Sequence, residues 1–438
     1  MRKSFLGRIA AVAMGAVMAV SGISVTAAAE TFESADKAVR SINAGINLGN
    51  TLDSCGEWIG LYTEAKPSDY ETAWGNPVTT PEIIRVMKSA GFDAIRVPVT
   101  WAEHIDEKGN IDKVWLDRVQ EVVDYVLAED LYCIINVHHD AGSDGWLEAS
   151  SDCVNDTKFS NLWRNIAVRF KDYDERLMFE SFNEMLDSQN SWTSPRMGDA
   201  FDAINSFNQQ FVDAVRTTGG NNTQRNLMLQ TYSASTHPLA LANFEMPEDI
   251  VQNHLIVQIH NYDPAGFTSL DATWTTLTDK WGTDEEKAYF DDLFETLGDF
   301  SDEIGAPVVV GEFAANYKGN EPARELYAEY FVTAAKKEGI KCFWWETGDM
   351  ALIDRVGLKV KYPGVTEALT GVSVTADSPV KYGDANGDGY VNSIDASEVL
   401  KYCVGLGTPA DLKAADANKD GNVNSLDASE ILRIVIMG

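Results

Sequence analysis

The sequence predicts an α/β protein: a (β/α)8 barrel followed by a small all-helical domain. Eight short apolar segments between residues 42 and 346 alternate with segments of helical period, as in repeated βαβ units. Eight parallel strands close a barrel, whereas an open doubly wound sheet usually has a glycine-rich phosphate loop after its first strand, and this sequence has none there. Past residue 369 the composition changes and one motif occurs twice.

The predicted strands are apolar and most of them end in a polar or aromatic residue, the position from which barrels supply catalytic groups. The strands are expected at residues 42–50, 93–101, 132–140, 177–184, 227–233, 255–263, 307–313 and 342–346. The helices between them are expected at 81–90, 115–129, 159–170, 201–217, 284–302 and 321–338. Thr80 and Pro81 mark the start of the first helix, because proline suits the first helical position.

Two carboxylates at strand ends form the candidate reaction centre. Asn183 and Glu184 end the segment LMFESFNE, and Glu312 follows the apolar run VVVG. A lone glutamate at such a place is ordinarily a solvated loop residue. If both strands belong to one parallel barrel, however, their ends meet on one face. Glu184 and Glu312 then lie across one cleft, as glycoside hydrolysis requires.

The charge balance argues against binding of nucleic acid. The chain has 67 acidic and 35 basic residues and a formal net charge of −32, whereas nucleic-acid binding needs a basic surface. An acidic surface mainly favours solubility and accommodates a neutral substrate.

Residues 1–29 are expected to be a signal peptide. A basic start is followed by an apolar run rich in Ala and Val and by three alanines before Glu30. A membrane anchor is the alternative, which the many small residues disfavour, and no other run reaches the ~20 apolar residues of a span. We therefore expect an exported protein with no membrane segment. The five cysteines form no framework, although a bridge between Cys55 and Cys153 stays open.

The motif that occurs twice has the spacing of a 12-residue calcium loop. Its copies begin 32 residues apart, and position 6 is Gly389 or Gly421, where such a loop turns sharply. Oxygen ligands for two Ca²⁺ ions are expected from Asp384, Asn386, Asp388, the Tyr390 carbonyl, Asn392 and Asp395, and from Asp416, Asn418, Asp420, the Asn422 carbonyl, Asn424 and Asp427.

Each loop is followed by a predicted helix, at 394–404 and 426–435, but no clear helix enters the first loop, and position 12 is Asp rather than Glu. In these features residues 382–438 resemble a type I dockerin, the duplicated calcium module that binds cohesin domains on a cellulosome scaffold. The resemblance implies that a cohesin, docking in either of two orientations, contacts Ser393, Ile394, Lys401, Ser425, Leu426 and Arg433. A domain that only stabilises the enzyme through bound metal is the alternative. Residues 371–381 are expected to be a polar linker.

Residues 30–370 resemble a glycoside hydrolase of family five, of the cellulase type. The resemblance rests on motifs that occur in the family's order along the whole predicted barrel. They are GINLGNTLD from Gly45, TAWGNP from Thr72, IRVPVTW from Ile95, NVHHD from Asn136, FNE at Glu184, IHNYDP from Ile259, GEF from Gly311 and FWWETG from Phe343.

This resemblance implies a role for each polar residue at the strand ends. Glu184 is the general acid/base and must carry a proton to give to the leaving oxygen. Glu312 is the nucleophile and must be ionised, which Arg96 and Tyr262 favour. Asn183 hydrogen-bonds the sugar 2-hydroxyl, and His260 orients Glu184.

Sugar contacts are expected from His138, His139, Trp345, Trp74, Asn47 and Asn50, with Trp58 and Trp101 as further aromatic candidates. Packing in the core is the ordinary alternative for any one tryptophan, and a turn is the alternative for Gly49-Asn50. Trp344 should point away from the cleft and serve the barrel. His138 and His139 are consecutive, so on a strand they should point to opposite faces and share no metal.

We therefore expect a secreted, retaining endo-β-1,4-glucanase that acts on β-glucan without a catalytic cofactor and reaches a cellulosome through its dockerin. Xyloglucan, mixed-linkage glucan, xylan and mannan stay open as substrates, because subsite loops rather than the fold decide among them. The other classes considered are a carbohydrate-binding protein with an inactive barrel and a calcium sensor. The presence of both carboxylates opposes the first, and the missing entering helix opposes the second.

Overall fold

The computed structural model describes residues 32–141, 145–192, 194–374, 382–387 and 390–437. Its main body is a closed barrel of eight parallel strands that pair in sequence order, with the last strand beside the first. The strands are β1 (Gly45–Asn47), β2 (Ala94–Val97), β3 (Tyr132–Ile135), β4 (Leu177–Glu180), β5 (Leu227–Gln230), β6 (Leu255–His260), β7 (Val308–Phe313) and β8 (Lys341–Trp344). The predicted barrel is confirmed.

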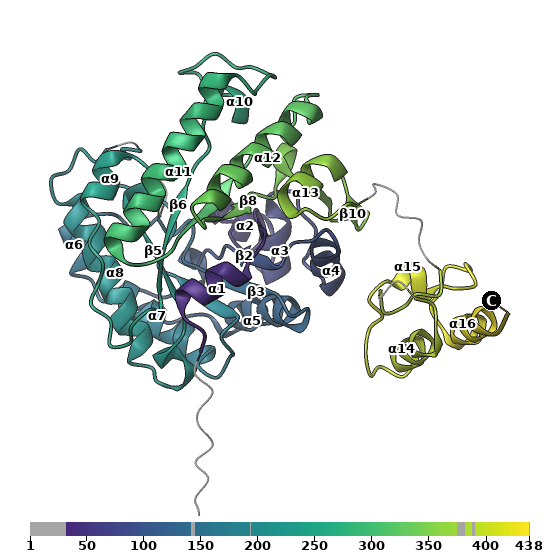
Figure 1. Ribbon diagram of the computed structural model, residues 1–438. Helices are drawn as coiled ribbons and strands as arrows, with labels where there is room; N and C mark the ends of the chain where they lie inside the picture. The colour runs from purple at the N-terminus through teal and green to yellow at the C-terminus, as the bar shows by residue number, and fades with distance from the viewer. Residues whose placement is uncertain (1–31, 142–144, 193, 375–381, 388–389, 438) are drawn as a thin grey trace, which may run out of the picture. The chain divides into compact units, whose positions relative to one another are not determined.

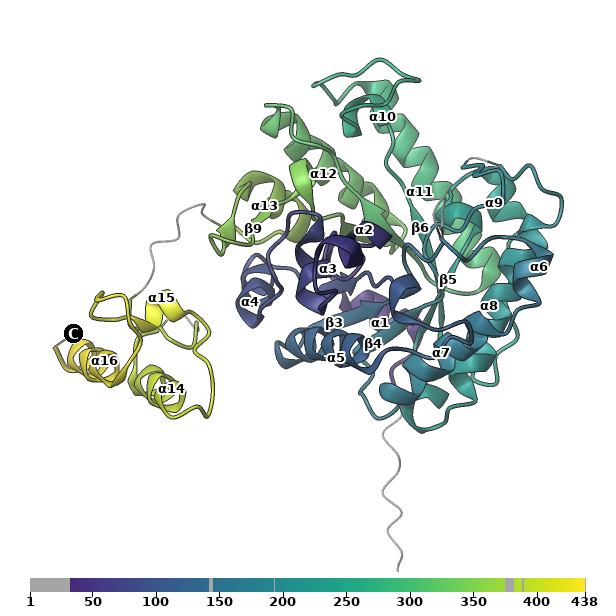
Figure 2. The ribbon, with the colours of Figure 1, turned by 180° about the vertical axis from the view of Figure 1, so that it is seen from behind.

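Helices form the outer layer around the strands (Figure 1 and Figure 2). They are α2 (Glu57–Tyr62), α3 (Pro67–Ala73), α4 (Pro81–Ser89), α5 (Lys113–Ala128), α6 (Ser151–Val154), α7 (Lys158–Arg169), α8 (Ala200–Arg216), α9 (Pro238–Ala242), α10 (Ala265–Thr268), α11 (Asp284–Ile304), α12 (Glu321–Lys337) and α13 (Pro363–Thr370). A short hairpin, β9 (Ile353–Asp354) and β10 (Lys359–Val360), follows β8. Because helices cover the strands from outside, both faces of each strand are buried, which explains their continuous apolar runs.

A short helix that the sequence did not reveal, α1 (Ala35–Ser41), packs against the inward side chains at the N-terminal ends of the strands. Ser34 caps it by accepting a hydrogen bond from the Lys37 N–H at 3.3 Å. The helix and its neighbour Ile42 share one buried cluster with Ala94, Ile134, Met178, Met228, Ile256, Val309 and Phe343. This apolar layer closes the N-terminal end of the barrel, so polar side chains that could react are expected at the C-terminal end.

A polar layer lies above the apolar one. Side chains alternate along a strand, so the residue two positions after an inward-facing residue also faces inward. The residues at these positions are Arg96, Asn136, Glu180, Gln230 and Gln258, two positions after Ala94, Ile134, Met178, Met228 and Ile256. All five polar residues are fully buried, so their polar groups need partners inside the barrel.

All eight strands are present, and seven of them end earlier than expected, whereas β7 ends at Phe313 as expected. β4 stops at Glu180 rather than Glu184, and β2 stops at Val97 rather than Trp101. Past these ends the chain continues with single backbone bonds, such as Asn183 N–H to the Val137 carbonyl at 2.8 Å. Asn183, Glu184 and Tyr262 therefore lie in short loops after their strands, whereas His260 and Glu312 lie within β6 and β7.

The C-terminal domain is described by itself. α14 (Ser393–Cys403) and α16 (Ser425–Met437) are the two helices expected after the loops, and they pack against each other. α15 (Leu412–Ala415) precedes the second loop. Its core is small and consists largely of alanine: Ala385, Ala396, Val399, Ala415, Ala417, Ala428 and Ile431. A core of this size buries little apolar surface, so the domain needs further stabilisation from its loops.

Four expectations concern the signal peptide, the linker, membrane segments and the disulfide bridge. The predicted signal peptide lies outside the described residues, as do residues 375–381 of the predicted linker. Within the described part of the chain, no helix is both long and apolar enough to cross a membrane. The bridge to Cys55 is not formed, because Cys153 is a free thiol.

Candidate active site

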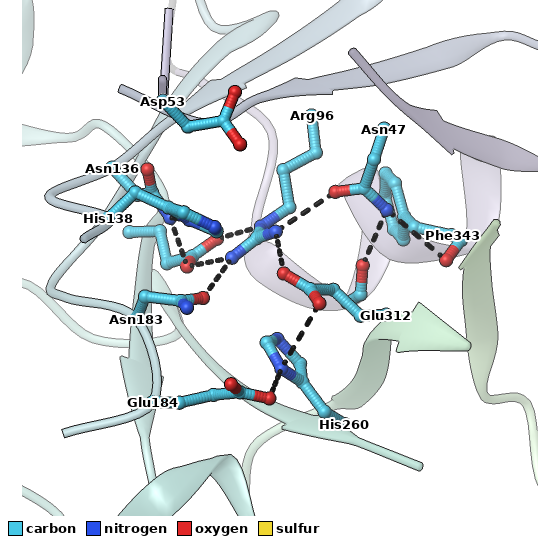
Figure 3. A network of polar contacts seen from close by, with 12 residues as sticks. Asn47, Asp53, Arg96, Asn136, His138, Asn183, Glu184, His260, Glu312 and Phe343 are labelled. Atoms are coloured by element: carbon cyan, nitrogen blue, oxygen red, sulfur yellow. Dashed lines mark hydrogen bonds and ion pairs between the residues drawn. The ribbon is translucent and has the colours of Figure 1, made fainter. Parts of the chain in front are cut away.

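Six residues predicted from four motifs form one network of hydrogen bonds and ion pairs at the C-terminal end of the barrel, and Figure 3 labels all of them except Tyr262. Arg96 is its centre and is fully buried. Its contacts reach Glu312 and Asn183, and further hydrogen bonds connect Glu312 to Tyr262 and His260 to Glu184. The structure thus brings together residues from β2, β4, β6 and β7 or from the loops after them.

All five N–H donors of Arg96 have acceptors. Nε and Nη2 donate to the two oxygens of Glu180 at 2.6 and 2.7 Å, and Nη1 donates to Glu312 Oε1 at 2.6 Å. The remaining donors reach Asn47 Oδ1 and Asn183 Oδ1, both at 2.9 Å. Burial by itself would lower the pKa of Arg96, but Glu180 and Glu312 raise it above its usual value, so the guanidinium stays charged.

Glu312 is almost completely buried, with 4% of its surface exposed. Burial raises the pKa of Glu312, while His260, Arg96 and the Tyr262 hydroxyl oppose this rise by favouring the carboxylate. The Tyr262 hydroxyl donates to Glu312 Oε2 at 2.8 Å. Burial and the neighbouring acidic groups hold the pKa of Tyr262 well above its usual value, so the phenol keeps its proton and remains a donor.

Glu184 is more exposed than Glu312, with side-chain exposures of 22% and 6%. His260 lies between them, with Nδ1 2.8 Å from Glu184 Oε1 and 3.6 Å from Glu312 Oε2. Gln258 Nε2 lies 3.2 Å from His260 Nε2, while the other ring nitrogen, Nδ1, faces Glu184. Oxygen atoms of the two carboxyl groups approach to within 4.8 Å.

A local irregularity aligns this part of the site. The register between β6 and β7 shifts between Ile259 and His260, which places His260 opposite Glu312. Gly311 is required beside it, because a Cβ there would come within 2.1 Å of the Gln258 side chain. In the GEF motif, Gly311 therefore leaves room for the Gln258 side chain, and the next residue, Glu312, supplies the carboxylate.

Asn47 does not lie where a sugar-binding residue would lie, and this expectation is corrected. Its side chain is fully buried on β1. Oδ1 accepts from Arg96, and Nδ2 donates to the carbonyl oxygens of Gly311, Phe343 and Trp344 at 2.9 to 3.3 Å. Both polar atoms of the Asn47 amide are therefore engaged inside the barrel, and these bonds connect Arg96 to β7 and β8.

The expectation that His138 and His139 point to opposite faces is wrong. β3 ends at Ile135, so strand alternation no longer applies, and the two rings lie 4.5 Å apart. With Asp53 they form a group whose ligand atoms lie within 4.8 Å of one another. A shared metal is nevertheless disfavoured. Asn136 donates to His138 Nδ1 at 3.0 Å, and burial holds the pKa of His138 well below its usual value, so this neutral ring carries its proton on Nε2.

The aromatic candidates divide into exposed and buried residues. Trp345 is partly exposed and stacks parallel to His138 at 5.7 Å, and Gly49 is required where it packs, because a Cβ would come within 2.9 Å of the indole. Trp74 lies beside His139, with ring centres 5.3 Å apart. Trp101 is fully buried and is removed as a sugar-stacking candidate, and Trp344 is buried in the barrel as expected.

A cleft of about 320 Å³ opens beside Trp74. Asn50 borders it at a bend in the chain, with a left-handed φ of 53°. Other lining residues include Asn76, Glu346, Asp354 and Lys361. Trp58 lies on α2 and is 45% exposed.

Sequence reasoning missed the polar layer beneath the two carboxyl groups. Glu180 was treated as part of an apolar strand, yet it forms two hydrogen bonds with Arg96. Asn136 and Gln230 donate to Glu180 Oε1 at 2.9 and 3.0 Å, and Gln258 contacts His260. The signal was available, because each residue lies two positions after an apolar residue of a predicted strand.

The two loops of the C-terminal domain fold around their last aspartate. Asp395 accepts from the backbone N–H groups of Asn386 and Asn392, and Asp427 accepts from those of Asn418 and Asn424, at 2.8 to 3.1 Å. In the second loop the side chains of Asp416 and Asp420 also accept backbone bonds, and Gly421 has a φ of 87°. Asp388 and Gly389 lie outside the described residues.

The residues expected to meet a partner are all exposed. Ile394 and Leu426 are 56% and 62% exposed at the starts of α14 and α16. Ser393 and Ser425 precede them, and Lys401 and Arg433 lie one turn after Glu398 and Glu430, with which they pair. Repeat-related residues thus occupy equivalent positions on two helices.

A (β/α)8 barrel that holds two facing carboxyl groups above a buried arginine defines a glycoside hydrolase. The chain belongs to glycosyl hydrolase family 5, since the cellulase model of that family matches residues 54–351, and it carries a type I dockerin domain, matched at residues 382–435.

Known proteins of this family resemble the chain over most of its length. It is 38% identical over 388 residues to Endoglucanase A of Clostridium longisporum, and the alignment covers 84% of this chain and 72% of that protein. A broad-specificity endoglucanase from Ruminococcus champanellensis with bound cellotriose has a TM-score of 0.72 and 36% identity, covering 78% of this chain and 100% of that one. A family 5 enzyme from Prevotella bryantii, solved as a mutant with a xyloglucan tetradecasaccharide, has a TM-score of 0.70 and 36% identity, covering 78% of this chain and 98% of that one.

Proposed function

We propose that this glycoside hydrolase is a secreted endo-β-1,4-glucanase that acts with retention of anomeric configuration. The observation that carries the proposal is the approach of Glu184 and Glu312 to within 4.8 Å. Retaining enzymes hold their carboxyl groups about 5–5.5 Å apart, whereas inverting enzymes need about 6.5–9.5 Å to admit a water molecule. The asymmetric burial of the pair supports two different roles.

In the first step Glu312 attacks the anomeric carbon as a carboxylate. The bond from that carbon to the glycosidic oxygen breaks, its electron pair goes to the oxygen, and Glu184 supplies the proton. Arg96 and Tyr262 orient Glu312 by bonding one oxygen each. Asn183 offers its Nδ2 group to the sugar 2-hydroxyl, because Oδ1 is held by Arg96.

In the second step Glu184, now a carboxylate, takes a proton from water. The water oxygen attacks the anomeric carbon, and the ester bond to Glu312 breaks with its electron pair returning to the carboxylate. His260 donates to Glu184 throughout and keeps it facing the reaction centre. The two inversions together retain the configuration.

The substrate proposed is a neutral β-glucan chain. Trp345 beside His138 and Trp74 beside His139 offer flat aromatic faces, and pyranose rings stack on such faces. Xyloglucan is the second candidate, favoured by the xyloglucan-bound relative from Prevotella bryantii. The polar cleft beside Trp74 offers room for a branch sugar. Mixed-linkage glucan, xylan and mannan are further outcomes of the test below.

The dockerin is proposed to bind two Ca²⁺ ions and a cohesin. Each loop presents only oxygen donors, from Asp384, Asn386, Asp388, the Tyr390 carbonyl, Asn392 and Asp395 and from their counterparts 32 residues later, which suits a hard cation. The bound ion would neutralise the clustered carboxylates and order the loops around the small alanine core. We also propose that the protein is exported and joins a cellulosome. Its catalytic domain would span residues 30–370 and its dockerin domain residues 382–438.

The test measures hydrolysis of carboxymethyl cellulose, mixed-linkage glucan, xyloglucan, xylan and mannan by the wild type, Glu184→Gln and Glu312→Gln. The exposed Glu107→Gln serves as the control, because it changes the same functional group away from the site. We expect both site variants to lose at least about 10²-fold in kcat on the preferred glucan, while the control does not. Full activity in either site variant would show that the roles are misplaced, and an inactive wild type would leave a binding protein.

A further inference from the structure

A third carboxylate shares Arg96 with the proposed nucleophile. Glu180 ends β4 and is fully buried. It holds Arg96 through two parallel bonds of 2.6 and 2.7 Å, whereas Glu312 holds Arg96 through one bond of 2.6 Å. Paired, charge-assisted bonds of this kind fix the plane of a guanidinium group.

Glu180 is held as a carboxylate. Asn136 and Gln230 both donate to its Oε1, in addition to the two donors of Arg96. Burial alone would raise the pKa of Glu180, but Arg96 and the Asn136 amide lower it below its usual value. Four donors and no exposed surface leave Glu180 no room to touch a sugar.

The charge balance around Arg96 changes during the proposed reaction. In the resting site one buried cation faces two buried carboxylates, Glu180 and Glu312. When Glu312 becomes the glycosyl ester it loses its charge, and the cation would then lack a partner. A buried charge without a partner is strongly destabilising.

We propose that Glu180 is a positioning residue that fixes the guanidinium of Arg96 and balances its charge while Glu312 carries the sugar. This inference rests on the proposed retaining mechanism. The negative charge of Glu180 also offsets part of the positive charge of Arg96. Glu312 is therefore more basic and more nucleophilic than it would be if Arg96 were paired with Glu312 alone. A merely structural Glu180 would stabilise the barrel without affecting the ionisation of Glu312.

The test uses the full-length protein and a 2-deoxy-2-fluoro cellobioside with a dinitrophenolate leaving group, which traps the covalent intermediate. Glu180→Gln keeps the shape but removes the charge. We expect its inactivation rate to fall at least about 100-fold, since an uncompensated buried cation costs that much or more. We also expect the acidic limb of its kcat/KM profile to move to lower pH, because Arg96 then acts on Glu312 alone.

Two further variants separate this role from a structural one. Glu180→Asp keeps the charge, so its acidic limb should stay at the wild-type pH even if its rate falls. Ser181→Ala, a buried neighbour that bonds Asn208, is the control for lost polar packing and should match the wild type in both readouts. Unfolding temperatures are measured for all three.

The inference is overturned if Glu180→Gln is trapped at the wild-type rate, or if its acidic limb does not move. If Glu180→Gln does not fold, the pH profile of Glu180→Asp provides the test instead. An acidic limb of its kcat/KM profile displaced to lower pH, despite the retained charge, contradicts the inference. Failure of the retaining mechanism itself would appear differently, as a wild type that the reagent never labels.

Discussion

Removing the Tyr262 hydroxyl should move the acidic limb of the activity profile to higher pH. The hydroxyl donates to Glu312 Oε2 at 2.8 Å and favours the carboxylate in a site where burial raises its pKa. A hydrogen bond to a charged group contributes about 1.5–3 kcal/mol. Since 1.36 kcal/mol corresponds to one pKa unit, Tyr262→Phe should move the limb upward by about one to two units.

The assay is kcat/KM for an aryl cellobioside as a function of pH, because this quantity reports ionisations of the free enzyme. Tyr327→Phe is the matched control. It also loses a buried phenol hydroxyl, but that hydroxyl donates to the backbone carbonyl of Asp263, at 3.3 Å, rather than to Glu312. An acidic limb that stays in place or moves to lower pH in Tyr262→Phe would refute the assigned electrostatics.

Three further predictions concern the supports of the site and the second domain. Asn47→Ala should lower the free energy of unfolding by about 2–4 kcal/mol, measured in urea, because Arg96 and three carbonyl groups lose their partner; a loss below about 0.5 kcal/mol would contradict the network. Burial raises the pKa of Asp140 to about 7, above its unfolded value of about 3.9, so its contribution to the free energy of unfolding should fall as the pH rises between these values. Asp140→Asn should flatten this part of a stability-against-pH curve, and an unchanged slope would argue against it. Chelation of Ca²⁺ should abolish cohesin binding while hydrolysis of a soluble β-glucan continues, and equal loss of both would show that the ion also supports the barrel.

The sequence was sufficient for the barrel because its strands and helices differ in period and composition. It was less informative about where strands end. Asn183 and Glu184 continue an apolar run in the sequence, but the hydrogen-bonded strand stops at Glu180. The same effect misplaced His138 and His139, whose relative orientation is set by a loop rather than by strand alternation.

The candidate site was predicted from residues that face the cleft, and its supporting layer was missed. Glu180, Gln230 and Gln258 are polar residues within apolar strands, and only barrel closure shows that they meet around Arg96 and His260. Asn47 illustrates the converse error, because an amide near a strand end resembled a sugar ligand and instead holds Arg96. Both the missed polar layer and the misplaced Asn47 depend on contacts between strands that are distant in the sequence.

The measurement that tests the account most directly is the site of covalent labelling. The wild type is incubated with the 2-deoxy-2-fluoro cellobioside, digested, and analysed by mass spectrometry of its peptides. We predict one added glycosyl group, on Glu312. A label on Glu184, or an active enzyme that the reagent never labels and that releases the inverted sugar, would contradict the retaining mechanism.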